Sequence, residues 1–301
     1  MAPRTLLFLA LGALAVYFLI RWIRVASTRL RARHEPPPRP NALELAVGFV
    51  TNFFDTLGIG SFAPTTSVFK LKRIVPDEGI PGTLNVGHTP PVILQAFIFI
   101  AIVTVEPVTL IALITAAVLG AWLGAGVVAR LRRRQIQVGM GIALLLAAGL
   151  FVMAIFGLFP AGGTATGLTG ARLAAAAAAS FVLGALMTLG IGFYAPSMIM
   201  LSLLGMNPVT AFPIMMGACA FLMPVAAVRF VEADRYSLRP ALGLAIGGLP
   251  AVLVAALIVK SLPLNAMRWL VVVVVLYAAT AMLRSAAREP APAIAPAPPH
   301  E

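Results

Sequence analysis

The chain has 301 residues, of which 60% are hydrophobic and 11% are charged, and its formal net charge is +12. Soluble domains carry about 25% charged residues, so this composition excludes a water-exposed globular protein. Apolar runs of roughly 18 or more residues recur along the chain, each long enough to cross a bilayer as a helix, and the alternation typical of an outer-membrane barrel is missing. We therefore predict an all-α, polytopic transmembrane helical bundle.

The positive charge is gathered in short clusters beside the apolar runs. Residues 21–39 hold six arginines, residues 70–73 hold two lysines and an arginine, and residues 130–134 hold four arginines. Basic clusters next to spans follow the positive-inside rule, so we expect contact with membrane lipid and no nucleic-acid binding. Cys219 is the single cysteine, which excludes an internal disulfide and a cysteine-rich metal site.

The first apolar run extends from Leu6 to Ile23 and ends in arginine-rich sequence instead of a cleavage site, unlike a signal peptide. We interpret residues 1–24 as a retained transmembrane anchor with its N-terminus outside. A basic, proline-rich cytoplasmic linker follows over 25–42. The Pro/Ala-rich tail, residues 285–301, is expected to be disordered.

Between these ends, residues 43–158 and 173–284 form two copies of one unit, separated by an external Gly/Thr-rich linker at 159–172. Thr-Leu-Gly-Ile-Gly at 56–60 recurs at 188–192, and both copies continue to Ala-Pro. In each unit the motif interrupts an apolar stretch, at 43–69 and at 175–204, and three predicted spans follow. These spans are 81–104, 108–129 and 136–158 in the first unit and 210–231, 241–259 and 266–284 in the second.

The charged loops predict how the two units are oriented. In the first unit the arginine cluster 130–134 follows the second of the three spans, whereas in the second unit the charged loop 229–239 follows the first. Because corresponding loops of the two units differ in positive charge, we predict inverted-topology repeats. Such repeats need an odd number of membrane crossings per unit. We therefore favour a broken, re-entrant helical hairpin plus three spanning helices in each unit, with one full crossing in place of the hairpin as the alternative.

The duplicated motif also predicts where a ligand binds. Gly-x-Gly followed by proline interrupts a helix, and in a bilayer this is tolerated only where protein or a water-filled cavity covers the backbone. The interruption frees N–H groups and a helix N-terminus, so two facing breaks predict an anion site; close helix packing is the alternative. The predicted substrate-binding residues are Thr56, Gly58, Gly60, Thr188, Gly190, Gly192, Tyr194 and Asn85.

Two ionisable side chains lie within the apolar stretches of the first unit. Asp55 stands beside the first break, where it either carries a coupling proton or accepts backbone N–H bonds. His88 is either a proton relay or a neutral ring bonded to a carbonyl freed by neighbouring prolines. Asn52 and Gln95 complete the predicted polar support, whereas the second unit has Met187 at the position of Asp55.

At these residues the sequence resembles the sulfite exporter TauE/SafE family of membrane permeases. The resemblance covers residues 43–284 and rests on the motifs TLGIGSFAP and TLGIGFYAP and on the spacing of the later spans. The family's more common form is a GIGGG-type run ending in proline, so Ser61-Phe62 and Phe193-Tyr194 indicate a divergent subgroup. The resemblance implies a secondary transporter of the bacterial inner membrane that moves sulfite, a sulfonate or a related sulfur-containing anion by alternating access.

Two other classes of function stay open from the residues alone. A membrane scaffold or assembly subunit would transport nothing, and a membrane enzyme would use Asp55 with His88. The sequence has no metalloprotease, P-loop or hydrolase motif and no closely spaced His/Cys/carboxylate metal set. We therefore predict no enzymatic activity, no cofactor and no metal, and homo-oligomerisation stays open.

Overall fold

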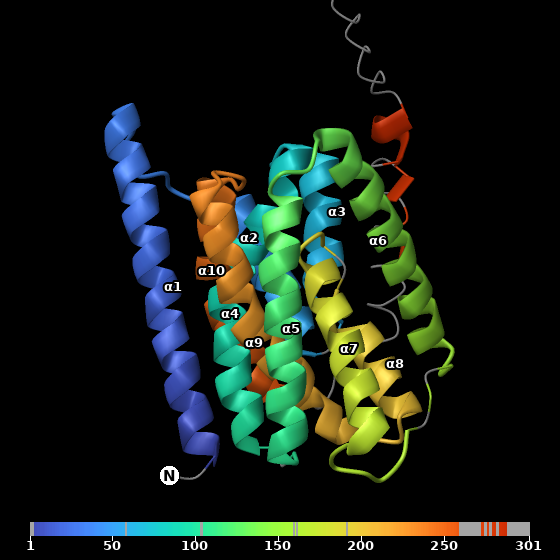
Figure 1. Ribbon diagram of the computed structural model, residues 1–301. Coiled ribbons are helices and arrows are strands. Elements are labelled where there is room, and N and C mark those ends of the chain that lie inside the picture. Colours follow the sequence, from blue (N-terminus) through green and yellow to red (C-terminus); the bar gives the residue numbers. More distant parts are fainter. Residues whose placement is uncertain are drawn as a thin grey trace, which may run out of the picture.

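The computed structural model describes residues 3–57, 59–102, 105–158, 160, 162–190 and 192–258, together with short pieces between 272 and 287. Figure 1 shows long helices standing side by side in one bundle. Within the described residues the named elements are all helical. The predicted all-α class is therefore confirmed.

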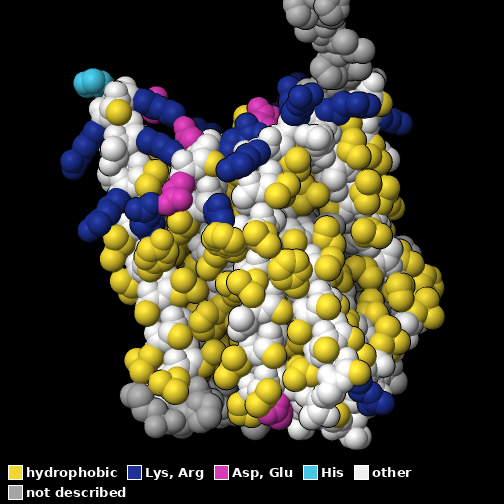
Figure 2. All heavy atoms as spheres, in the orientation of Figure 1, with side chains coloured by type: hydrophobic (Ala, Val, Ile, Leu, Met, Phe, Trp, Pro, Cys, Tyr) yellow, Lys and Arg dark blue, Asp and Glu magenta, His cyan; other side chains and the backbone are white. Residues whose placement is uncertain are grey.

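Seven helices in the described part of the chain are long and apolar enough to cross a membrane. Their exposed surface is a broad apolar band, and lysine and arginine side chains gather at one end of the bundle (Figure 2). These features fit a polytopic membrane protein. The last predicted span, 266–284, lies mostly outside the described residues. The seven helices are Thr5–Arg33, Asp77–Ala101, Pro107–Val128, Arg133–Ile155, Gly170–Met187, Phe212–Glu232 and Leu238–Leu257.

Helix α1 (Pro3–Arg33) lies at the edge of the bundle (Figure 1). It continues past Arg24, where the sequence predicted the anchor to end. Arg29 and Arg33 lie one helical turn apart, and their guanidinium groups donate to the Asp234 carboxylate at 2.8 and 2.9 Å. This pairing explains the extra turns, because it holds the basic end of α1 against the turn between α9 (Pro208–Glu232) and α10 (Leu238–Ile258).

Each stretch that carries the duplicated motif forms two helices with a non-helical break between them. Gly60 and Gly190 adopt φ values of +88° and +109° at the breaks, a backbone conformation that glycine reaches without a Cβ clash. The glycine motifs therefore end the first helix of each pair, as predicted. The pairs are α2 (Ala42–Thr56) with α3 (Phe62–Lys72) and α7 (Gly170–Met187) with α8 (Tyr194–Leu203).

The remaining helices form the body of the bundle. At its centre α4 packs against α9, α2 packs against α10, and α7 packs against α5. Each helix that precedes a break therefore contacts a long helix of the other unit. The remaining elements are η1 (Asp77–Gly79), α4 (Ile80–Ile102), α5 (Pro107–Val128), α6 (Arg133–Ile155), α9 (Pro208–Glu232) and α10 (Leu238–Ile258).

Small residues allow these helix pairs to come close together. A Cβ atom added to Gly247 of α10 would overlap with the Leu45 carbonyl of α2. A Cβ atom added to Gly184 of α7 would likewise overlap with the Ala117 carbonyl of α5. Close backbone approach at small residues is the usual means of packing helices within a bilayer.

Polar contacts place the start of α2 and the end of α3 at the basic end of the bundle. Glu44 near the start of α2 accepts from Arg239 of α10 at 2.9 Å. Lys70 near the end of α3 donates to Asp77 at 2.7 Å, and Asp77 also accepts from Gln137 of α6 at 2.8 Å. In Figure 1 these helix ends lie together at the top of the bundle.

The start of α7 and the end of α8 lie at the opposite end. The Asn207 N–H, which follows α8, donates to the Ala165 carbonyl in the loop before α7 at 2.8 Å. The Glu106 N–H, at the start of α5, donates to the Thr166 carbonyl of the same loop at 3.1 Å. The loop before α7, the residue that follows α8 and the start of α5 are therefore joined by backbone hydrogen bonds.

Candidate functional site

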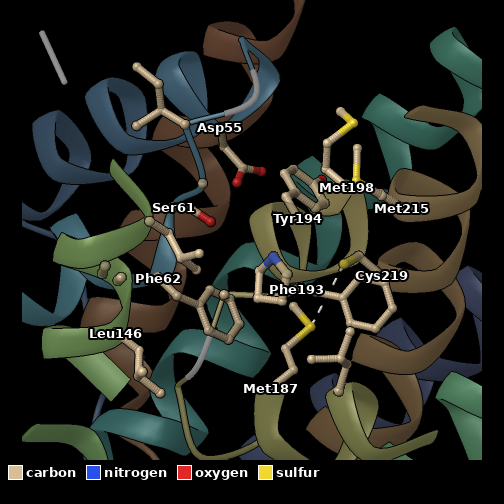
Figure 3. A pocket seen from close by; sticks show the side chains of 18 of the residues that line it. Asp55, Ser61, Phe62, Leu146, Met187, Phe193, Tyr194, Met198, Met215 and Cys219 are labelled. Atoms are coloured by element: carbon tan, nitrogen blue, oxygen red, sulfur yellow. Dashed lines mark hydrogen bonds between the residues drawn. The ribbon is translucent and has the colours of Figure 1, made fainter. Parts of the chain in front are cut away.

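A cavity of about 800 Å³ lies between the two breaks and α6 (Figure 3). This volume falls within the range of small-molecule sites, roughly 300–1,000 Å³. The first break contributes Leu57, Ile59, Gly60 and Ser61, and the second contributes Gly192 and Phe193. The two copies of the glycine motif therefore meet at one place, although they lie far apart in the sequence.

Most of the cavity lining is apolar. Asp55 is the one charged side chain among the described residues that line it, and no lysine or arginine does so. Ser61 and Tyr194 add a hydroxyl group each. An anion in this cavity would therefore depend on backbone N–H groups, because none of the described lining residues is a lysine or arginine.

Two helices begin at the cavity. Ala63 in the first turn of α3 and Pro196 in the first turn of α8 both line it. Their N-cap residues, Ser61 and Phe193, make no side-chain cap hydrogen bond. A helix N-terminus carries unpaired N–H groups and a partial positive charge, so the cavity combines one carboxylate with two weakly positive helix ends.

Gln95 of α4 connects the two units across the cavity wall. Its side-chain nitrogen donates to Asp55 Oδ2 at 2.9 Å and to Thr56 Oγ1 at 3.0 Å. Its side-chain oxygen accepts from the Tyr194 hydroxyl at 3.1 Å. Asp55 and Thr56 end α2 and Tyr194 begins α8, so one amide joins the first break to the second.

His88 belongs to a separate buried chain of hydrogen bonds. Asn52 donates through Nδ2 to the Gly48 carbonyl at 2.7 Å, so its Oδ1 is the acceptor for His88 Nδ1 at 3.0 Å. The other ring nitrogen, Nε2, then accepts from the Thr65 hydroxyl at 3.0 Å. Every polar atom of the neutral ring is paired. His88 does not line the cavity, so this geometry favours a structural role in joining α4 to α2 and α3.

Asn85 and Thr188 lie behind the second break. Asn85 Nδ2 donates to the Pro81 carbonyl at 2.9 Å and, at 3.5 Å, to the Thr188 carbonyl. The Thr188 hydroxyl donates to the Ala185 carbonyl at 2.6 Å. Neither residue lines the cavity. Asn85 Oδ1 is buried and has no hydrogen-bond partner within the described part of the protein.

The predicted binding residues thus divide into two groups. Asp55, Gly60, Gly192 and Tyr194 line the cavity. Gly190 shapes the second break through its positive φ without lining the cavity, and Gly58 lies outside the described residues. The predicted residues that support the lining from behind are Asn52, Thr56, Asn85, His88, Gln95 and Thr188.

Two features of the lining were not predicted from the sequence. Ser61 faces the cavity (Figure 3), and its position where the resembled family more often has glycine was the available signal. Sulfur-containing side chains also line the cavity, including Met215, Cys219 and Met223 of α9. Their four-residue spacing was visible in the sequence and places them on one helix face.

Comparisons of the chain with protein-family models, with curated proteins and with solved structures find no match. In the described part of the chain, seven helices are long and apolar enough to cross a membrane, and two broken stretches meet at one cavity that the Asp55 carboxylate lines.

Proposed function

We propose that the protein is a secondary permease that moves a small anion across the inner membrane of a bacterium by alternating access. The resemblance to the TauE/SafE family points to sulfite, a sulfonate or a related sulfur-containing anion as the substrate. One observation carries the proposal: both copies of the glycine motif border the same cavity. Paired breaks of this kind form the substrate sites of many transporters.

The proposed mechanism needs two inverted repeats, each opening with a re-entrant hairpin. This topology is supported by the contacts of Glu44 and Lys70 at the basic end and of Ala165 with Asn207 at the other end. The helix packing supports it further. The contact of α2 with α10 in one direction corresponds to the contact of α7 with α5 in the other, as expected when the two units swap places. One unit can then rock against the other around a fixed site. The positive-inside rule assigns the basic end to the cytoplasm.

The anion would lie at the starts of α3 and α8, where backbone N–H groups are available, and the Tyr194 hydroxyl would reach it by exchanging its bond to the Gln95 oxygen. An ionised Asp55 would oppose this binding, since like charges about 5 Å apart repel by roughly 3 kcal/mol at an effective dielectric constant of about 20. The anion therefore binds better when Asp55 carries a proton. This linkage couples anion movement to a proton gradient, and the sequence holds no nucleotide-binding loop that would supply another source of energy.

Flux into proteoliposomes tests the proposal. The purified protein is expected to move sulfite or a sulfonate faster than chloride, and an imposed pH gradient is expected to change the rate. Asp55→Asn should abolish the response to the pH gradient, whereas Glu35→Gln, at an exposed carboxylate of the linker, should behave as the wild type. Absence of flux for every anion tested would refute the permease, and a normal pH response in Asp55→Asn would refute the coupling role.

A further inference from the structure

Two basic pockets adjoin at the end of α5. The first, of about 370 Å³, is lined by the last turns of α5 and by Arg229 of α9. The second, of about 430 Å³, is lined by the α5–α6 turn, by Glu78 of η1 and by Arg235 of the α9–α10 turn. Arg130 and Leu131 line both pockets. The two pockets together are called the basic groove below.

Arg229 is held flat against α5 in this groove. Its guanidinium carbon lies 4.3 Å from the centre of the Trp122 ring, within the range of a cation–π contact. Gly126 leaves room for it, since a Cβ atom added there would lie 3.3 Å from Arg229 Nη1. Tryptophan is enriched where spans meet the lipid headgroups. The contact therefore holds Arg229 at the headgroup level, which the presence of basic residues in loops does not by itself explain.

The groove carries an excess of positive charge. Among the described residues that line it are five arginines and one carboxylate, Glu78. Arg133 Nε lies 3.8 Å from Glu78 Oε2, so this carboxylate already has a cationic neighbour. The ion pairs within the described part of the chain include none of the other four arginines of the groove, which are Arg130, Arg132, Arg229 and Arg235.

Arg235 also presents a donor without an acceptor. Its Nη2 donates to the Leu131 carbonyl at 2.8 Å, which fixes the guanidinium beside the α5–α6 turn. Its Nε is buried and has no hydrogen-bond partner among the described residues. A buried N–H group without a partner is costly, and a phosphate oxygen in the groove would supply the missing acceptor.

An apolar helix face continues from the arginines. Trp122, Leu123 and Val127 of α5 line the same pocket as Arg229 and are 47%, 49% and 61% exposed. Figure 2 shows an apolar band directly below the basic end of the bundle. A free anion would leave this face uncovered, whereas a phospholipid would place its phosphate on the arginines and its acyl chains on the apolar side chains. The groove therefore matches a lipid better than a soluble anion.

We propose that the basic groove binds an anionic phospholipid with two phosphate groups, diphosphatidylglycerol. One phosphate lies between Arg130 and Arg229, the other reaches Arg132 and Arg235, and an acyl chain lies along Trp122. Basic pockets between spanning helices bind headgroups of this kind, and the guanidinium fork suits phosphate oxygens. The site does not depend on the proposed anion transport, because lipid binding is measured without flux.

Native mass spectrometry of the delipidated full-length protein in detergent tests the site. We expect one tightly bound diphosphatidylglycerol per chain, weaker binding of phosphatidylglycerol, which has one phosphate, and the weakest binding of zwitterionic phosphatidylcholine. Arg130→Gln should weaken the binding of diphosphatidylglycerol about fivefold, and Arg130→Gln combined with Arg229→Gln about twenty-fivefold. Inorganic phosphate at millimolar concentration should not displace the lipid.

The matched control removes the same charge elsewhere. Arg24→Gln combined with Lys72→Gln changes two exposed cations that do not line the groove, and its affinity for the lipid should equal that of the wild type. Arg130 is exposed, so Arg130→Gln alone keeps the fold if the double variant does not fold.

Each contrary result has a definite meaning. Equal binding of phosphatidylcholine, unchanged affinity in Arg130→Gln, or an equal loss in the control would overturn the site. Equal affinity for the lipids with one and two phosphates would overturn the assignment of diphosphatidylglycerol, and displacement by inorganic phosphate would assign the groove to a free anion instead. Absence of anion flux in protein that binds the lipid normally would refute the permease alone.

Discussion

The side-chain amide of Gln95 donates a hydrogen bond of 2.9 Å to the carboxylate of Asp55. The same amide accepts from the Tyr194 hydroxyl at 3.1 Å, and all three side chains are buried. A buried carboxylate or hydroxyl without a partner carries the full cost of its lost hydration. Gln95 therefore stabilises two breaks at once, and its removal affects both units.

We expect Gln95→Leu to lower the free energy of unfolding by about 1–3 kcal/mol, because Asp55 and Tyr194 each lose a partner. Tyr194→Phe removes only the hydroxyl bond to the Gln95 oxygen and should cost about 1 kcal/mol. Thermal unfolding of the purified variants in detergent measures both effects. Equal stability of Gln95→Leu and the wild type would show that water replaces the amide.

His88→Phe tests whether His88 acts in structure or in proton movement. The substitution removes the bonds to Asn52 and Thr65 and should lower the free energy of unfolding by about 2 kcal/mol. The dependence of anion flux on pH should keep its midpoint, since the ring does not line the cavity. A shifted or abolished pH profile in folded His88→Phe protein would instead assign His88 to the proton path.

The glycine contacts between units predict a third set of effects. Gly184→Leu and Gly247→Leu place side chains against backbone carbonyls of the facing helix and should lower the free energy of unfolding by about 3 kcal/mol or more. Gly12→Ala on α1 is the control, because no atom lies within 4 Å of the added Cβ. Melting temperatures report the difference, and a stable Gly184→Leu variant would contradict the observed packing of α7 on α5.

Glu106 gives a prediction about pH outside the spans. Its carboxylate accepts from the backbone N–H groups of Thr109 at 2.6 Å and Val108 at 3.0 Å, and these bonds, that of Thr109 foremost, lower the pKa of Glu106 below its ordinary value of 4.5. A lowered pKa in the folded state means that ionised Glu106 stabilises the protein above pH 4.5, and that this contribution is lost as the pH falls through the lower, folded pKa.

Glu106→Gln should therefore reduce the melting temperature near neutral pH. The difference in melting temperature from the wild type should shrink as the pH falls below the ordinary carboxyl pKa of 4.5. Thermal unfolding across this range checks the sign. Glu35→Gln serves as the reference, since Glu35 lies exposed in the linker. A gap that widens in acid would contradict the capping role of Glu106.

Much of the fold could be predicted because it depends on local sequence. Hydropathy alone gave the long helices, and Gly-Ile-Gly predicted where α2 and α7 end, since glycine acts on the backbone of its own turn. The extra turns of α1 could not be predicted in this way. They depend on the contacts of Arg29 and Arg33 with Asp234, which lies 205 and 201 positions later in the chain.

The site was predictable in part for the same reason. Asp55 and Tyr194 are close to the two glycine motifs in the sequence. Any fold that brings the two breaks together therefore also brings these two side chains to the cavity. His88 was ambiguous because its role depends on which groups reach its two nitrogens, and Asn52 and Thr65 come from separate helices. The four-residue spacing of Met215, Cys219 and Met223 was visible in the sequence. Hydropathy, however, does not distinguish a helix face that borders a cavity from one that packs in a core.

The packing of α2 on α10 has a consequence for biosynthesis. The ribosome makes α2 before α10. The face of α2 that carries Gly48 therefore contacts lipid or the insertion machinery until α10 has entered the membrane. The same delay applies to α5, which waits for α7. A chain cut after the first unit would expose an interrupted helix to lipid, a state that bilayers do not tolerate. The contacts of α2 with α10 and of α5 with α7 therefore form only after the second unit has been made.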